Sequence, residues 1–368
     1  MMILVDGLRK WVYPDAKTLV MVFILLFLLD QALAYRMSTV MSGNGHYREE
    51  VEGKNTFGVY LEQIKQDPYP KVLMLGNSVM FGSASKNDSE TIPVFLAEYL
   101  NQGQGEEVHV YNLGIKGLGI ADAYYLLGLL RDAQNGIDLI VYDLNIGWFN
   151  EPNLINRPFI LEQYPMEQID WKRLGVEPPE KDDTTDGWIK ENILRHWRLF
   201  NYRDLVNNWI FGRNATVMVE DQARYTFKPS SKEEDQEIYL PWYEKNWEAK
   251  YQGDWKIGSI SYTDEQWKYF QFLLALMNDI SRESLVFFTP QNDVLLKRYN
   301  KLDEAGLEEA KQKLAQVAEE GHVQFFDYEE LLPDRLFSDS IHPMPAGNRI
   351  IAKQLFEDIQ QMGVFSDQ

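Results

Sequence analysis

The chain has 368 residues, of which 36 are Lys or Arg and 56 are Asp or Glu, so its formal net charge at pH 7 is −20. With 45% hydrophobic and 13% aromatic residues it can build a large core, which excludes the disordered and fibrous classes. The excess of negative charge disfavours nucleic acid as a partner, because general binding to it requires basic side chains that neutralise phosphates. The chain has no Cys, which excludes disulfides, zinc–thiolate sites, iron–sulfur clusters and a Cys nucleophile.

An apolar segment near the amino terminus predicts a membrane anchor. Residues 19–29 are apolar without a break, and residues 18–36 are just long enough to cross a bilayer as a helix. Basic residues before this segment favour a cytoplasmic location for residues 1–17, with the rest of the chain outside the cell membrane. Two alternatives are a signal peptide cleaved after Ala34 and a buried helix of a soluble protein. Residues 37–70 are predicted to be a tether.

Short apolar runs and helical segments alternate after this tether. Five runs predict buried strands, at residues 72–75, 108–111, 139–142, 285–288 and 323–326. Four helices are predicted in the same part of the chain, at residues 93–100, 121–131, 304–320 and 346–356. Strands that alternate with helices indicate βαβ units, so the expected fold class is α/β with a five-stranded parallel sheet.

A long insertion, residues 151–283, separates the third and fourth predicted strands. It holds most of the Trp residues, which we expect mainly to pack within the insertion, with stacking on sugar rings as the alternative. Seven of them are Trp188, Trp197, Trp209, Trp242, Trp247, Trp255 and Trp267. The last helix of the insertion is predicted over residues 264–280, because Thr263 and Gln266 match a capping box.

Polar residues that suit catalysis follow the predicted strands. Ser78 comes after the first strand, Gly117 after the second, Asn145 after the third, and Asp339 with His342 after the fifth. In a parallel sheet of this type the carboxyl ends of the strands meet at one edge, where ligands bind. The sequence therefore predicts that residues far apart in the chain form one site at that edge.

These residue types supply the parts that a serine nucleophile needs. A Ser hydroxyl requires a base to take its proton, a carboxylate to orient the base, and donors for the oxyanion that forms. His342 is the expected base, and Asp339, three residues earlier, is the expected orienting carboxylate. The backbone N–H groups of Ser78 and Gly117 and the side chain of Asn145 are the expected oxyanion hole, where each donor contributes about 3 kcal/mol.

Together these blocks resemble those of the SGNH/GDSL hydrolases, a family of serine esterases and acyl transferases with a flavodoxin-like fold. The match lies in Gly76-Asn77-Ser78, in residues 112–117 and in residues 339–342. It implies a three-layer α/β/α domain made of residues 71–150 and 284–368. It also implies that Ser78 is the nucleophile, His342 the general base and acid, and Gly117 an oxyanion donor.

The sequence departs from the family pattern in two blocks. Asn77 replaces the Asp of the G-D-S motif, which we expect to change hydrogen bonding in the turn more than the chemistry. The third block, normally G-x-N-D, reads Asp143-Leu144-Asn145 here, so Asn145 is the nearest candidate for the oxyanion residue and Asn150 a second one.

The sequence gives little support for a nucleotide-binding site or a metal site. Gly114, Gly117 and Gly119 follow the order G-x-x-G-x-G, which differs from the G-x-G-x-x-G order of dinucleotide-binding loops. The five His residues include no H-E-x-x-H pair, so we expect neither a metal nor another cofactor.

The expected function is transfer of an O-acyl group, most simply acetyl, to or from a cell-surface glycan or exopolysaccharide outside the cell membrane. The resemblance implies a polytopic membrane acyltransferase as a further partner, because some membrane-anchored relatives work with one. The alternative is a catalytically silent binding or scaffold subunit of a complex that modifies or exports polysaccharide.

Overall fold

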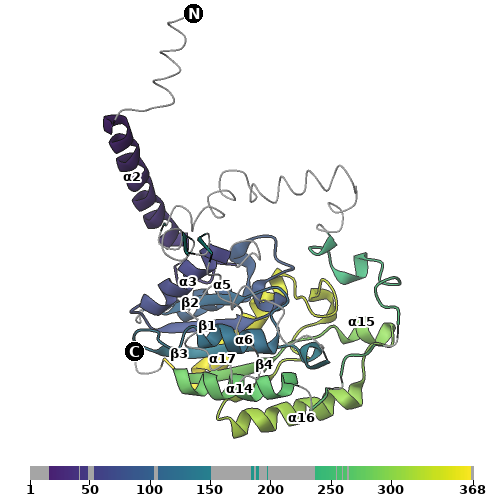
Figure 1. Cartoon of the computed structure of the whole chain (residues 1–368). Coiled ribbons are helices and arrows are strands. Elements are labelled where there is room, and N and C mark those ends of the chain that lie inside the picture. Colours follow the sequence, from purple (N-terminus) through teal and green to yellow (C-terminus); the bar gives the residue numbers. More distant parts are fainter. Residues whose placement is uncertain are drawn as a thin grey trace, which may run out of the picture. The chain divides into compact units, whose positions relative to one another are not determined.

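The structure is a computed structural model (Figure 1). It describes residues 16–40, 42–48, 54–102, 107–150, 184–185, 188–189, 197, 237–253, 255–258, 260–262 and 265–365. The chain forms two compact units, one of residues 1–40 and 181–218 and the other of residues 41–180 and 219–368. The first unit contains the helix α2 (Ala16–Val40). No helix in the described part of the chain is both long and apolar enough to cross a membrane, so the anchor expected over residues 18–36 stays a prediction.

The second unit is built on a five-stranded parallel sheet with strand order β2-β1-β3-β4-β5. Its strands are β1 (Lys71–Gly76), β2 (His109–Gly114), β3 (Ile137–Leu144), β4 (Ser281–Phe288) and β5 (Gln324–Asp327). All five predicted strands are therefore confirmed. β1 and β2 are two residues longer than predicted, β3 and β4 are four residues longer, and β5 is shifted by one residue. All six residues of β1 are buried, as the apolar run after Pro70 predicts for a central strand covered on both faces.

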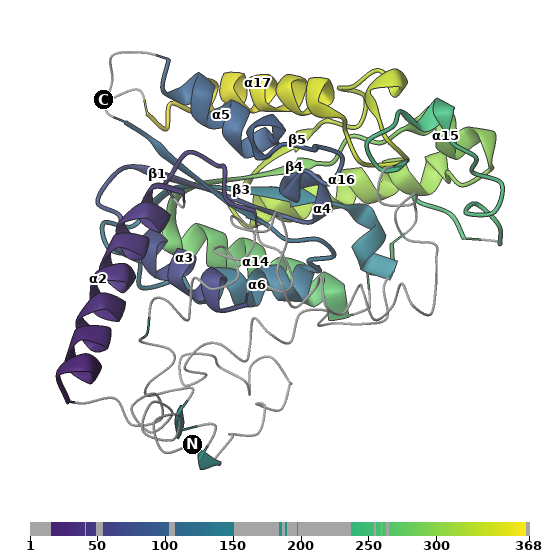
Figure 2. The same ribbon diagram turned by 90° about the horizontal axis from the view of Figure 1, so that it is seen from above.

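Helices cover both faces of this sheet (Figure 2). The longer ones are α3 (Lys54–Gln66), α5 (Ile92–Leu100), α6 (Ile120–Gly128), α14 (Glu265–Ile280), α16 (Glu304–Glu320) and α17 (Pro345–Met362). In Figure 2, α5 and α17 lie on one face, and α3, α6 and α14 lie on the other. The predicted α/β fold is thus confirmed, and the four helices predicted among its strands lie within two residues of their expected starts.

Shorter helices lie in the connections, and several of them carry the site. They are α4 (Ser78–Phe81), α15 (Asp293–Arg298) and the 3-10 helices η1 (Asp88–Glu90), η2 (Ile146–Asn150), η5 (Trp242–Glu244) and η6 (Asp334–Leu336). Three of them, α4, η2 and α15, follow the carboxyl ends of β1, β3 and β4. These connections therefore lie at the edge of the sheet where the sequence places the candidate residues.

Part of the stretch predicted as a tether belongs to the compact unit. Helix α3 buries one face, with Phe57, Tyr60, Leu61 and Ile64 at most 1% exposed. A bridge between Asn44 and Val110 ties the preceding residues to β2. A free tether does not describe these segments, because the amphipathic pattern over residues 57–64 is that of a helix with one buried side.

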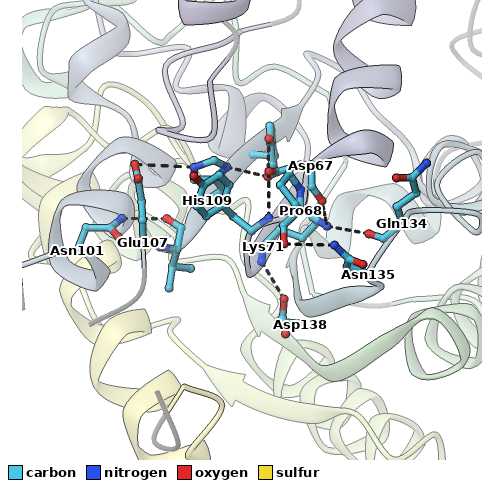
Figure 3. A network of polar contacts seen from close by, with 12 residues as sticks. Asp67, Pro68, Lys71, Asn101, Glu107, His109, Gln134, Asn135 and Asp138 are labelled. Atoms are coloured by element: carbon cyan, nitrogen blue, oxygen red, sulfur yellow. Dashed lines mark hydrogen bonds and ion pairs between the residues drawn. The ribbon is translucent and has the colours of Figure 1, made fainter. Parts of the chain in front are cut away.

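A buried polar network joins the amino ends of β1 and β2, at the edge opposite the candidate site (Figure 3). The Lys71 ammonium donates to the backbone carbonyls of Asp67, Gln134 and Gly136 at 2.7, 3.0 and 3.2 Å. The Asp67 carboxylate lies 2.7 Å from Nδ1 of His109 and accepts a hydrogen bond from the Tyr111 hydroxyl at 2.8 Å. Burial opposes ionisation of Asp67, but these two partners outweigh it and hold the pKa of the carboxyl below its usual value.

The described part of the insertion contributes buried aromatic residues. Trp242, Trp247 and Trp267 are at most 7% exposed, so they are packed, although Trp242 and Trp267 contact Asp334 and Phe149, which lie outside the insertion. Trp188, Trp197 and Trp255 are between 41% and 60% exposed, and Trp209 lies outside the described residues.

Candidate active site

The nucleophile candidate Ser78 is the first residue of α4, directly after β1. Asn77 caps this helix, since its side-chain oxygen accepts a hydrogen bond from the N–H of Val79 at 2.9 Å. The helix turn ends at Gly82, whose φ of 80° lies in the left-handed region that favours glycine. Ser78 is half-buried, so its hydroxyl is held by a short, capped turn and is still partly accessible to solvent.

This turn lies directly on the neighbouring strand because two glycines leave it room. A Cβ atom on Gly114, at the end of β2, would lie 2.3 Å from the backbone nitrogen of Phe81. A Cβ atom on Gly76 would lie 2.8 Å from the Cβ of Met80. Both distances are shorter than atoms can tolerate, so the glycines of the first two blocks let α4 approach the sheet closely.

The acid–base loop, residues 337–344, presents the other two residues of the predicted triad. Nε2 of His342 lies 2.7 Å from Oγ of Ser78, although the two residues are 264 positions apart in the sequence. Nδ1 of His342 lies 2.7 Å from Oδ2 of Asp339. The structure therefore brings Ser78, His342 and Asp339 into one hydrogen-bonded chain.

The Asp339 carboxylate is fixed by its own loop. Its Oδ1 accepts hydrogen bonds from the N–H groups of Ile341 and His342, both at 2.9 Å. Burial raises the pKa of this carboxyl, but the positive charge and hydrogen bond of His342 and the two N–H groups outweigh burial, so the pKa lies well below its usual range. An ionised carboxylate only accepts hydrogen bonds, so Nδ1 of His342 carries a proton and Nε2 is free to accept the one from Ser78.

The two other oxyanion candidates lie on either side of the nucleophile. Gly117 follows β2 and Asn145 follows β3, the two strands that flank β1. Gly117 has a φ of 72°, and Oδ1 of Asn145 accepts a hydrogen bond from the N–H of Gly147 at 2.8 Å. Within the described structure neither residue is hydrogen-bonded to Ser78, and the side chain of Asn150 lies outside it. The oxyanion hole stays a prediction.

Sequence reasoning missed a set of residues that hold the acid–base loop in place. Lys245 donates two hydrogen bonds to Ser338, to the backbone oxygen at 2.7 Å and to the hydroxyl at 2.9 Å. Trp242 donates its backbone N–H to Phe337 at 3.0 Å and its indole N–H to the backbone oxygen of Asp334 at 2.9 Å. The insertion therefore clamps the residues next to Asp339, and no motif in the sequence indicates this.

Asn292, which follows β4, holds the same loop from the side of the sheet. Its side chain donates to the backbone oxygen of Asp339 at 3.2 Å, and its N–H donates to that of Ser340 at 2.8 Å. Its side-chain oxygen also caps α15, where it accepts from the N–H of Leu295 at 3.1 Å. The connection after β4 thus supports the catalytic loop although it supplies no member of the triad.

The described residues include no group of three or more His, Asp or Glu side chains that could hold a metal ion. Of the His residues outside the triad, His109 belongs to the network at the opposite edge of the sheet. The chemistry that the site offers with its own residues is that of a serine nucleophile with a histidine base.

Comparisons with known proteins find similarity at the level of structure. No protein-family model and no curated protein matches the sequence. Solved structures similar to the chain include Axe2, an acetylxylan esterase from Geobacillus stearothermophilus, at 12% identity and a TM-score of 0.39 over 80% of this chain and 96% of that one. Another is Est24, a carbohydrate acetylesterase from Sinorhizobium meliloti, at 11% identity and a TM-score of 0.37 over 80% of this chain and 99% of that one.

Proposed function

We propose that this protein is a serine acyl-enzyme of the SGNH type that cleaves or transfers O-acyl esters, most simply acetyl esters, of a carbohydrate. The observation that carries the proposal is the hydrogen-bonded chain in which Nε2 of His342 lies 2.7 Å from Oγ of Ser78 and Nδ1 lies 2.7 Å from Asp339. A base in contact with a hydroxyl and oriented by a carboxylate is the arrangement that activates serine for attack on a carbonyl carbon.

In the first step Oγ of Ser78 attacks the ester carbonyl and passes its proton to Nε2 of His342. The imidazolium that forms is stabilised by the Asp339 carboxylate, which stays ionised because its pKa lies well below neutral pH. The tetrahedral intermediate then collapses, and His342 returns the proton to the leaving sugar oxygen. This leaves the acyl group on Ser78 as an ester.

The oxyanion of the tetrahedral intermediate requires donors near Ser78. The N–H of Ser78 is at the first position of α4, where a helix leaves it without an intrahelical acceptor. We assign it to the oxyanion hole, together with the N–H of Gly117 and the side-chain amide of Asn145. Loss of one such donor costs about 3 kcal/mol of transition-state stabilisation.

The acyl-enzyme is resolved by a second nucleophile, again with His342 as the base. Water gives an esterase, whereas a sugar hydroxyl gives a transferase. The two activities use the same triad and differ in the acceptor that occupies the site, so both follow from one acyl-enzyme.

For the cellular setting we propose an enzyme anchored by residues 18–36, with its catalytic domain outside the cell membrane and a surface glycan or exopolysaccharide as its substrate. The apolar segment and the basic residues before it support this orientation. A polytopic membrane acyltransferase is the partner that we propose as the source of acyl groups.

The decisive experiment is covalent labelling of Ser78. A fluorophosphonate probe should add once to the wild-type chain, as measured by intact mass, and Ser78→Ala should abolish the adduct together with hydrolysis of p-nitrophenyl acetate. Ser83→Ala is the matched control, because Ser83 is a buried residue just beyond the same helix turn and lies outside the triad. Absence of any adduct on the wild type would favour the silent scaffold subunit instead.

Two further measurements define the setting. A labelled acetyl donor incubated with and without acetyl-free glycan distinguishes transfer from hydrolysis, because only a transferase places label on the glycan. Proteolysis of intact cells tests the orientation, and a catalytic domain that stays protected until the cells are lysed would contradict a location outside the membrane.

A further inference from the structure

Asp143 is a buried carboxyl group directly beside the nucleophile turn, and the mechanism above does not use it. It lies near the carboxyl end of β3 and is 1% exposed. Leu75 of β1 pairs with Tyr142, so Asp143 is the strand neighbour of Gly76, two residues before Ser78. A Cβ atom on Gly76 would lie 2.7 Å from the Cβ of Asp143, which shows how close the carboxyl group is to this backbone.

The contacts of Asp143 leave its negative charge incompletely neutralised. The hydroxyl of Thr289 donates to Oδ1, whereas Oδ2 is buried and has no hydrogen-bond partner in the described structure. The N–H groups of Asn77 and Met80 act on the carboxyl group electrostatically, although neither makes a hydrogen bond of ordinary geometry with Oδ2. The group therefore faces the start of α4 without an ion-pair partner in contact with it.

The groups around Asp143 act on its ionisation in opposite directions. Burial raises the pKa of Asp143 to about 6, while Thr289, the N–H of Met80 and the positive charge of His342 act in the opposite direction. Tyr142, its neighbour on β3, is a second titratable group affected by the Asp143 charge, and it is neutral because its own pKa is raised. The site thus contains two buried carboxyl groups, Asp339 in contact with His342 and Asp143 beside the turn that carries Ser78.

The neutral residue at position 77 fits this arrangement. Asn77 is 2% exposed, and its side-chain nitrogen has no hydrogen-bond partner in the described structure. A carboxylate at position 77 would lie in the same buried site as that of Asp143. Two like charges in one site repel each other, which raises the pKa of the carboxyl groups. Asn at position 77 avoids this repulsion and still caps α4 through its side-chain oxygen.

We propose that Asp143 is a positioning residue of the triad, which holds the turn carrying Ser78 through the charge of its carboxylate beside Gly76, and that Asn77 is its required neutral neighbour. This inference rests on the proposed function. During acylation a proton moves from Oγ of Ser78 to Nε2 of His342, and Asp143 neither gains nor loses a proton. Its charge lies in a buried site, where electrostatic interactions are stronger than in water.

The test is a pair of charge exchanges at positions 77 and 143. Asp143→Asn keeps the shape and removes the charge, so kcat for p-nitrophenyl acetate should fall roughly tenfold, since a displaced nucleophile lowers kcat more than KM. KM should stay within about twofold, and the melting temperature should not fall. The double variant N77D/D143N places one carboxylate back beside the turn and should recover most of the lost kcat.

Two controls separate this role from a structural one. Asn77→Asp alone puts two carboxyl groups beside the turn and should lower both kcat and the melting temperature. Asp138→Asn removes a carboxylate at the other end of β3, where it accepts the N–H of Lys71 at 2.8 Å, and should leave kcat unchanged.

The outcomes distinguish this inference from the proposed function. A wild-type chain that never labels at Ser78 would refute the proposed function. A reactive wild type with an equally fast D143N variant would overturn only the inference, as would a double variant that recovers nothing. A D143N chain that melts well below the wild type would also overturn it, because the carboxylate would then serve folding.

Discussion

Asp143 makes a specific prediction about how stability depends on pH. Its pKa is about 6 in the folded protein and 3.8 in an unfolded chain, so between these values the folded state holds a proton that the unfolded state releases. Stability is therefore unaffected by this group below pH 3.8, falls as the pH rises through this interval, and stays reduced above pH 6. A pKa difference of this size lowers the free energy of unfolding by about 3 kcal/mol at neutral pH.

The Asp143→Asn variant measures this contribution directly. We expect its free energy of unfolding, relative to that of the wild type, to rise by about 2.4 kcal/mol between pH 4 and pH 7.5, as determined by urea titration at four pH values. Other titrating groups are present in both chains and cancel in the comparison. Asp279→Asn, at a side chain that is 66% exposed, should give a difference within about 0.5 kcal/mol at every pH. A flat difference for Asp143→Asn, or one that falls with pH, would refute the reasoning.

Three further variants test other parts of the fold. Lys71→Met leaves three backbone carbonyls, one buried and two in half-buried hydrogen bonds, without their donor. It should lower the free energy of unfolding by about 3 kcal/mol in urea titration and leave kcat unchanged at the opposite edge of the sheet; a fall in kcat would contradict this. Gly114→Ala should slow fluorophosphonate labelling about a hundredfold, because the added Cβ would lie 2.3 Å from the Phe81 nitrogen and displace α4. Labelling at the wild-type rate would show that the turn accommodates the Cβ without moving Ser78. Lys245→Met removes both hydrogen bonds to Ser338 and should lower kcat/KM about tenfold while p-nitrophenyl acetate still binds. An unchanged kcat/KM would mean that the acid–base loop keeps its conformation without Lys245.

The sheet and the triad could be predicted because their signals are local. Each strand is a short apolar run, and each candidate residue follows the end of one, so the rule that parallel strands end at a common edge suffices to bring Ser78 and His342 together. The order of strands could not be predicted in the same way. It depends on which helix packs on which face, and that information lies in contacts between distant segments.

The features that the sequence did not indicate are those without a local pattern. Helix α3 lies in the stretch predicted as a tether from its small polar and charged residues, although Phe57 and Tyr60 of this helix are 1% exposed. Asp143 stands in an apolar run, and only its burial beside Gly76 gives it unusual properties. In the sequence Lys245 resembles any surface lysine, and only the folded structure shows its hydrogen bond to Ser338 of the acid–base loop.

The position of β5 explains why the acid–base loop needs so much support. The sheet order places β5 three strands away from β1, a distance of about 14 Å at about 4.8 Å per strand, so a loop that starts after β5 must cross the ends of β4 and β3 to reach Ser78. Asn292 holds this loop as it passes β4, and Lys245 holds it from the insertion. The intrinsic hydrogen bonds of Asp339 fix only the local shape of the loop. The 2.7 Å contact between His342 and Ser78 therefore depends on both outer supports, and the insertion contributes to catalysis by fixing the base even though it supplies no reacting group.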